Sequence, residues 1–217
     1  MKPLKYALKN EWYIFILLSI PFLAAPFIWH QLPAQIATHF DLQGQANGYS
    51  SKTFGLIFIP LLNIGIYLFL LYLPQIDPKK RITIDQKPIP VVRLIIVLFL
   101  FCIHGSIILN ALGYEIGSTN WALVAAAIFF IILGNYMRTI QPNYFIGIRV
   151  PWTLEDPKNW RQTHKMASWL WVAGGLILLL LFPFLGAQLY FNFFMAIAVA
   201  ISLLPCAYSF YLYKTKS

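Results

Sequence analysis

The chain has 217 residues, of which 59% are hydrophobic and only 11% are charged. With a mean hydropathy of +0.68, it is too apolar for an ordinary soluble domain, whose apolar share is about 45–50%. The net charge of +9 is spread over several short segments bordering apolar stretches, which argues against direct nucleic-acid binding and for a protein whose main partner is the lipid bilayer.

Six stretches are apolar and long enough to cross a hydrocarbon core of about 30 Å as helices, which takes roughly 17–25 residues each. The sequence therefore predicts an all-α integral membrane protein, a six-transmembrane-helix bundle forming a single membrane domain over residues 1–217. Residues 12–73 hold the first two spans around an external loop at 30–53, and residues 91–213 hold the other four around a cytoplasmic loop at 134–166. In chain order the expected spans are Tyr13–Trp29, Phe54–Leu73, Val91–Leu112, Trp121–Met137, Ala167–Leu185 and Tyr190–Tyr213.

The distribution of Lys and Arg predicts the orientation. Every Lys and Arg except Lys52 falls in the amino tail, in or beside the second or fourth connection, or in the carboxyl tail. Because cytoplasmic segments of membrane proteins are enriched in these residues, we expect both termini in the cytoplasm and the first loop outside.

The external loop contains two turn signals. Asp41-Leu42-Gln43-Gly44 fits a type I turn, and Asn47-Gly48 favours positive φ. Two turns around His39 and Phe40 predict a compact, ordered loop. His30, His39 and Asp41 are three potential metal ligands without a fourth, which favours a histidine that fixes the loop over a metal site. The candidate binding residues of this loop are His39, Phe40, Gly44, Asn47, Gly48 and Lys52.

The third span carries His104 near its middle, where an ionisable side chain is costly and often functional. It is equally well explained as a neutral imidazole hydrogen-bonded to Asn63 or Asn110 on a neighbouring helix. Both interpretations stay open at the level of the sequence.

The cytoplasmic loop is polar and cationic within an apolar chain. Asp156-Pro157 fits a helix N-cap and first helical residue, so a helix is expected to run through Trp160 and His164 into the fifth span. Upstream, Pro142–Leu154 is expected to form a structured loop at the inner mouth of the bundle.

Arg149 and His164 are the two candidate functional side chains of this loop. The planar guanidinium of Arg149 suits bidentate anions or a buried acid, and the alternative is an ordinary cytoplasmic arginine. His164, with Thr163 and Trp160 on the same helix face, is either a proton-responsive contact or an interfacial histidine hydrogen-bonded to Asn135 or Asn143.

Two segments resemble parts of known bacterial membrane proteins. The external loop resembles a small domain of unknown function found near the amino end of many six-span proteins, with Ala37 where a proline is more usual. The cytoplasmic run resembles the signature of the SdpI family, with Val150 in place of a more usual threonine. The matching elements are Gly134-Asn135, Pro142-Asn143, Gly147-Ile148-Arg149, Pro151-Trp152-Thr153-Leu154, Trp160 and Thr163-His164.

This resemblance implies immunity to a secreted killing peptide and, in the best-known case, capture of a soluble repressor at the membrane. An alternative is a membrane enzyme or a small-solute or lipid carrier acting at the cytoplasmic mouth, with Arg149, His164 and His104 as its polar groups. Because the sequence shows no Ser/His/Asp grouping, paired carboxylates or phosphate loop, we expect no catalysis, cofactor or metal. The candidate cytoplasmic binding residues are Asn135, Asn143, Gly147, Arg149, Trp152, Thr153, Trp160, Thr163 and His164.

Overall fold

A computed structural model describes residues 3–41, 45–78, 82–85, 88–114 and 118–215. These ranges contain eight helices and one two-stranded sheet. The elements in chain order are α1 (Pro3–Asn10), α2 (Trp12–Ile28), β1 (Gln35–Phe40), β2 (Ala46–Ser51), α3 (Lys52–Ile76), α4 (Ile89–Ala111), α5 (Ser118–Met137), α6 (Pro151–Glu155), α7 (Pro157–Leu181) and α8 (Ala187–Lys214).

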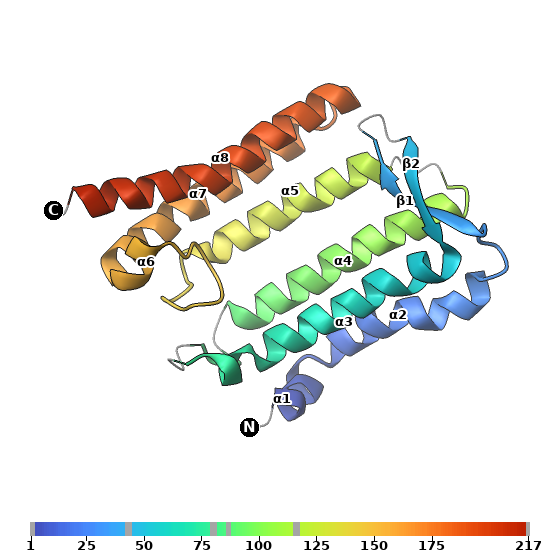
Figure 1. Ribbon diagram of the computed structural model, residues 1–217, viewed down its shortest axis with the longest axis horizontal. Coiled ribbons are helices and arrows are strands. Elements are labelled where there is room, and N and C mark those ends of the chain that lie inside the picture. Colours follow the sequence, from blue (N-terminus) through green and yellow to red (C-terminus); the bar gives the residue numbers. More distant parts are fainter. Residues whose placement is uncertain (1–2, 42–44, 79–81, 86–87, 115–117, 216–217) are drawn as a thin grey trace.

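The long helices run alternately up and down, and each packs against the next one in chain order (Figure 1). Helix α1, the loop before α6, α6 itself and the end of α8 lie where the helix axes end on one side, which we call the terminal end (Figure 1). The β-strands lie at the opposite end, which we call the hairpin end. The expected alternation of helices around one structured loop at each end is therefore present.

Four of the described helices, α3, α4, α7 and α8, are long and apolar enough to cross a membrane. A fifth crossing follows if α1 and α2, which meet at a bend of 86°, count as one broken span. Helix α5 has a shorter apolar part, Trp121–Met137. The chain is thus a mostly helical protein with several candidate spans.

The helix limits differ from the expected spans by a few residues. Helix α7 begins at Pro157, before the expected span start at Ala167, as the predicted helix through Trp160 and His164 requires. The largest other difference is at its end, expected at Leu185 and found at Leu181. Pro183 lacks the backbone N–H that would continue the helix. At the other end of α7, Asp156 accepts a hydrogen bond from the Lys158 N–H (2.8 Å) and Pro157 is the first helical residue, so the predicted N-cap is confirmed.

The expectation of an entirely α-helical chain is wrong at the external loop, where β1 and β2 form an antiparallel hairpin. Its inner side is anchored by Ile36, which is fully buried in an apolar cluster with Leu32, Leu56 and Ile107. The hairpin lets the two strands satisfy each other's backbone N–H and C=O groups.

The predicted Asn47-Gly48 turn is also wrong, because both residues lie inside β2. Gly48 pairs with His39 across the sheet, and a Cβ at Gly48 would lie 2.8 Å from the Cβ of His39. The glycine is thus explained by the close approach of the two strands. The other predicted turn includes residues 42–44, which lie outside the described residues; Asp41 and Gln45 flank it and exchange a backbone hydrogen bond of 2.8 Å.

Helices α5, α7 and α8 pack closely through small residues. A Cβ at Gly175 would lie 2.6 Å from the carbonyl oxygen of Ala127, and one at Gly134 would lie 2.6 Å from the Cβ of Trp171. A Cβ at Gly174 would come within 2.8 Å of Ile197 on α8. Such glycines allow helix backbones to approach within a bilayer, where apolar burial gives little drive for association.

Candidate functional site

The loop between α5 and α6 folds onto the first turns of α7 at the terminal end. Trp160 and His164 lie one helical turn apart, are fully buried, and stack with ring centroids 4.0 Å apart. The Trp160 indole Nε1 donates to the carbonyl of Ile140 (2.8 Å), and the Ile148 N–H donates to Nε2 of His164 (3.0 Å). The two rings therefore hold both ends of the loop against α7.

Both ring nitrogens of His164 are engaged. Nδ1 lies 2.9 Å from the carbonyl oxygen of Trp160, so it carries the hydrogen and donates, which leaves Nε2 free to accept from Ile148. Only the neutral imidazole satisfies both bonds. The expected partners, Asn135 and Asn143, are wrong: Asn135 is exposed at the end of α5, and Asn143 bonds within its own loop.

Gly147 allows this contact. Its φ of 109° lies in the region that favours glycine, and a Cβ there would collide with Nε2 of His164 and lie 3.2 Å from the Trp160 ring. A side chain at this position would displace the loop from both rings.

Asn143 and Thr153 fix the course of the loop. The amide of Asn143 donates to the carbonyls of Gln141 and Ile146 and accepts from the N–H groups of Phe145 and Ile146, at 2.7–3.0 Å. The Thr153 hydroxyl donates to the Ile148 carbonyl (2.8 Å) and accepts from the Val150 N–H (3.1 Å). Both side chains are buried, so they hold the loop rather than present a surface.

A second hydrogen-bond chain ties α6 and α7 to α8. Trp152 Nε1 donates to the hydroxyl of Ser209, and the Asn159 amide donates to the Ser209 carbonyl (2.8 Å). Thr163 in turn donates to Oδ1 of Asn159 (3.0 Å). Sequence reasoning missed Asn159 and Ser209. The position of Asn159, four residues before Thr163 on the same helix face, could have indicated the former.

Arg149 differs from these residues because its side chain is exposed. Its Nη1 donates to the Tyr144 carbonyl (2.6 Å), a neighbour within the same loop. Tyr144 is 39% exposed. The exposed side chains of the loop thus include the guanidinium of Arg149 and the phenol of Tyr144.

The loop also joins the helices of the N-terminal half, α3 and α4, to α7. Phe145 and Ile146 pack against Leu73 at the end of α3, Ile82 in the following connection and Ile89 at the start of α4. Ile146 also belongs to the apolar cluster around Trp160. A displacement of this loop would therefore change the packing of helices on both sides of it.

At the hairpin end, His39 and Asn47 are exposed neighbours on opposite strands. His39 Nδ1 and Asn47 Oδ1 are hydrogen-bonded, at 2.5 Å. Tyr49 lies two residues further along β2 with 60% of its surface exposed, while Phe40 is half-buried. Together these residues give the hairpin an outer face that is polar and aromatic. Gly44 lies outside the described residues.

Lys52, counted among the binding residues, is engaged within the protein. Its ammonium donates to the carbonyls of Trp29 (3.0 Å) and Leu32 (3.2 Å) and lies 4.6 Å from the centre of the Trp29 ring. A cation at the C-terminal end of α2 stabilises the helix dipole there. Among the described residues, no three His, Cys, Asp or Glu side chains gather as metal ligands.

His104 and Asn63 are buried in α4 and α3. Asn63 donates its amide nitrogen to the carbonyl of Val97 (3.1 Å), while Asn63 Oδ1 and His104 Nε2 have no hydrogen-bond partner among the described residues. The expected hydrogen bond from His104 to Asn63 or Asn110 is therefore not made by His104 Nε2.

Sequence reasoning missed a buried ion pair at the terminal end. Glu11, in the break between α1 and α2, bonds to Nη2 of Arg93 and accepts from its Nε at 3.1 Å. It also accepts from the hydroxyl of Tyr67 (3.0 Å), and Arg93 donates to the Ile84 carbonyl (3.0 Å). Arg93 was counted as a cytoplasmic cation, yet an arginine inside an apolar span requires a buried acid, and Glu11 is the acid that borders the first span.

Comparisons with known proteins agree with these two structured ends. The model of the SdpI/YfhL protein family matches residues 139–209, and that of a domain of unknown function (DUF1648) matches residues 16–64. The chain is 26% identical over 199 residues to the immunity protein SdpI of Bacillus subtilis (strain 168), which covers 92% of this chain and 93% of that protein. No solved structure matches. The chain is thus similar to the SdpI/YfhL protein family over residues 139–209 and to DUF1648 over residues 16–64.

Proposed function

We propose that this protein is a membrane immunity protein that protects the cell producing it from a secreted toxic peptide. The observation that carries this proposal is the similarity to an immunity protein over nearly the full length of both chains. Because that similarity takes in nearly the whole length of both proteins, the proposed role draws on the whole bundle and not on one shared motif.

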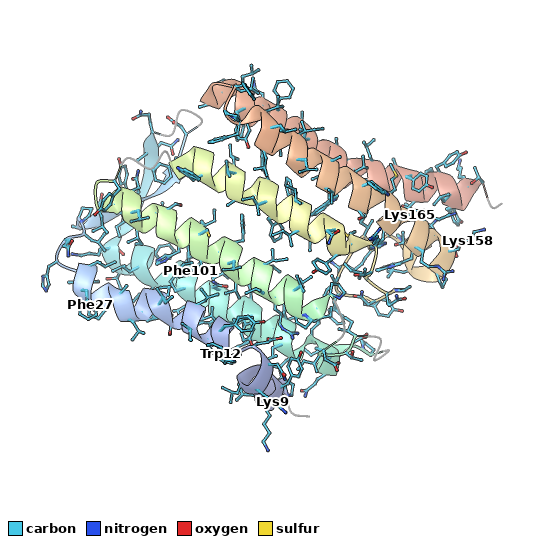
Figure 2. The ribbon with its side chains drawn as sticks, turned by 180° about the vertical axis from the view of Figure 1, so that it is seen from behind. Lys9, Trp12, Phe27, Phe101, Lys158 and Lys165 are labelled. Carbon is cyan, nitrogen blue, oxygen red and sulfur yellow. The ribbon has the colours of Figure 1, made fainter. Side chains whose placement is uncertain are left out.

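All six long helices span the bilayer in this proposal, with the terminal end in the cytoplasm. Each of them, α5 included, has at least the roughly 17 residues that a short crossing needs. Exposed cations gather at the terminal end, among them Lys9, Lys158 and Lys165 (Figure 2), as expected for a cytoplasmic face. Arg93 no longer counts toward this argument because it is buried against Glu11.

The outer face of the hairpin is the proposed contact for the peptide. His39, Asn47 and Tyr49 are exposed there, and the hairpin rests on a buried apolar base around Ile36. A polar and aromatic surface on a firmly held support suits recognition of an amphipathic peptide, since rigid aromatic side chains lose little entropy on binding.

Anchoring of a soluble repressor at the terminal end is a second proposed role. The observation that favours it is the exposure of Arg149 beside Tyr144 on a loop that contacts both halves of the bundle. In the alternative, an enzyme or carrier, Arg149, His164 and His104 would share one site. That alternative is weaker because His164 is bonded at the terminal end, whereas His104 lies toward the hairpin end of α4.

The proposal is tested by expressing the full chain in a sensitive host and adding the secreted peptide fraction of the organism that encodes it. We expect survival with the natural chain and reduced survival with His39→Ala/Tyr49→Ala at equal membrane abundance. The matched control is Thr38→Ala, on the same strand and half-buried. Killing that is equal with and without the natural chain would refute the proposal.

A further inference from the structure

Helix α1 lies across the bundle rather than along it. It meets α2 at a bend of 86°, so when α2 crosses the bilayer with an ordinary tilt of about 20°, α1 runs close to the plane of the membrane surface. Its inner side packs on the bundle, where Ala7 is fully buried with Ile14 and Leu71.

Two stripes on α1 stay exposed. Leu4 and Leu8 are one turn apart and 44% and 57% exposed, and Trp12 follows the bend at 59%. Lys5 and Lys9, also one turn apart, form the neighbouring stripe and are exposed. Lys9 extends away from the rest of the molecule (Figure 2). An apolar stripe beside a cationic one is the pattern of a helix that lies in the headgroup region.

The orientation of α1 is fixed by the buried ion pair at its end. Glu11 occupies the bend and is held by Arg93 and by Tyr67 (3.0 Å). The Arg93 guanidinium also lies 6.0 Å from the ring of Tyr6 on α1, within the range of a cation–π contact. Since α3 and α4 supply Tyr67 and Arg93, the angle of α1 is set by the bundle itself.

We propose that α1 is an in-plane anchor that binds anionic phospholipid. Leu4 and Leu8 enter the boundary between headgroups and acyl chains, while Lys5 and Lys9 pair with headgroup phosphates. The charge of the lysines and the exposed leucines together select this partner, because each lysine near an anionic membrane surface strengthens binding about fivefold. The inference concerns α1 alone and does not depend on the proposed immunity role.

The test uses the full chain with Cys102→Ser/Cys206→Ser, a single cysteine introduced as Leu8→Cys or Lys9→Cys, and an environment-sensitive fluorophore on that cysteine. The protein is reconstituted in phosphatidylcholine vesicles with or without phosphatidylglycerol. We expect the label at position 8 to be quenched by lipids brominated in their acyl chains, and the label at position 9 by aqueous iodide. Phosphatidylglycerol should increase the lipid quenching at position 8.

Lys5→Gln/Lys9→Gln should remove that increase, weakening the association of α1 with the anionic surface by about 25-fold, since each lysine contributes about fivefold. Lys158→Gln/Lys165→Gln is the matched control, because these exposed lysines lie at the same end of the bundle but on α7; it should leave the quenching at position 8 unchanged. Equal iodide quenching at positions 8 and 9, or lipid quenching at position 8 that phosphatidylglycerol does not alter, would overturn the proposal.

Discussion

At the residue scale, the loop between α5 and α6 is held mainly by side chains that bond to backbone groups. Asn143, Thr153, Trp160 and His164 each satisfy carbonyl or N–H groups of the loop, and all four are buried. A loop without regular structure must find such partners, because buried backbone groups without hydrogen bonds are costly. These residues therefore act as the framework of this loop.

Gly147→Ala should destabilise this framework more than any other glycine substitution outside the helix contacts. The new methyl group meets both a positive φ and the His164 ring, so we expect a loss of about 1–3 kcal/mol in the free energy of unfolding. Titration with a denaturing detergent measures it. Gly113→Ala, which has a φ of 88° but open space, should lose less, and Gly105→Ala, in open space within α4, should lose nothing. Equal values for the three variants would contradict this account.

The Glu11–Arg93 pair predicts strong energetic coupling. Both side chains are buried, at 1% and 0% exposure, so Arg93→Met leaves an unpaired buried carboxylate and should cost about 3–5 kcal/mol. Glu11→Leu should cost a similar amount, while Glu11→Leu/Arg93→Met should cost much less than the sum of the two. The same unfolding titration measures all three, and additive losses would show that the two charges do not interact.

The sequence singled out several residues of the loop between α5 and α6 but did not indicate their partners. Trp160, His164, Gly147 and Asn143 stood out by type and spacing, yet their bonds go to backbone groups, which carry no residue-specific mark. Glu11 and Arg93 lie 82 positions apart, and only the packing of α2 against α4 brings them together.

At the scale of elements, the external loop is the place where sequence and structure differ most. Turn signals were visible, but the strands were not, because β1 buries only the consecutive residues Ile36 and Ala37, without an alternating pattern, and β2 carries Gly48 near its centre. A two-stranded hairpin is marginal in isolation. Here it is stabilised by the apolar cluster beneath it.

Lys52 and His39 should respond differently to substitution, although both were expected to bind a ligand. Lys52→Met removes two hydrogen bonds that tie the start of α3 to the end of α2, so it should lower stability by about 0.3–1 kcal/mol and speed amide hydrogen exchange in β1 and β2. His39→Ala should leave exchange outside its own strand pair unchanged but reduce protection against the peptide. Hydrogen exchange followed by mass spectrometry, together with cell survival, distinguishes the effects of the two substitutions. Faster exchange throughout the bundle in His39→Ala would contradict a role of His39 in binding alone.

At the scale of the whole molecule, the helices lie side by side in a row, with the hairpin at one end of the helix axes and the loop before α6 at the other (Figure 1). Hydropathy was sufficient to locate these helices within a few residues because lipid demands long apolar stretches. It could not show the 86° bend before α2, since a short amphipathic helix and the start of a span have similar composition.

The proposed orientation predicts opposite labelling of the two ends. In a chain with Cys102→Ser/Cys206→Ser, Tyr49→Cys should react with an impermeant maleimide in intact cells, and Arg149→Cys should react only after the cells are broken. Both positions are exposed, so a difference reports the side of the membrane and not burial. Labelling of Arg149→Cys in intact cells would reverse the topology.

The central claim is that the intact bundle protects by binding a toxic peptide without changing it. In the most direct measurement, an isotope-labelled peptide fraction from the producing organism is added to cells with and without the chain. The chain is then purified, and the masses of the bound and free peptides are determined by mass spectrometry. We predict that a peptide of unchanged mass co-purifies with the natural chain, and that His39→Ala/Tyr49→Ala retains less of it. Survival accompanied by peptides of altered mass that appear only when the chain is expressed, with none bound to it, would contradict the account and favour an enzyme.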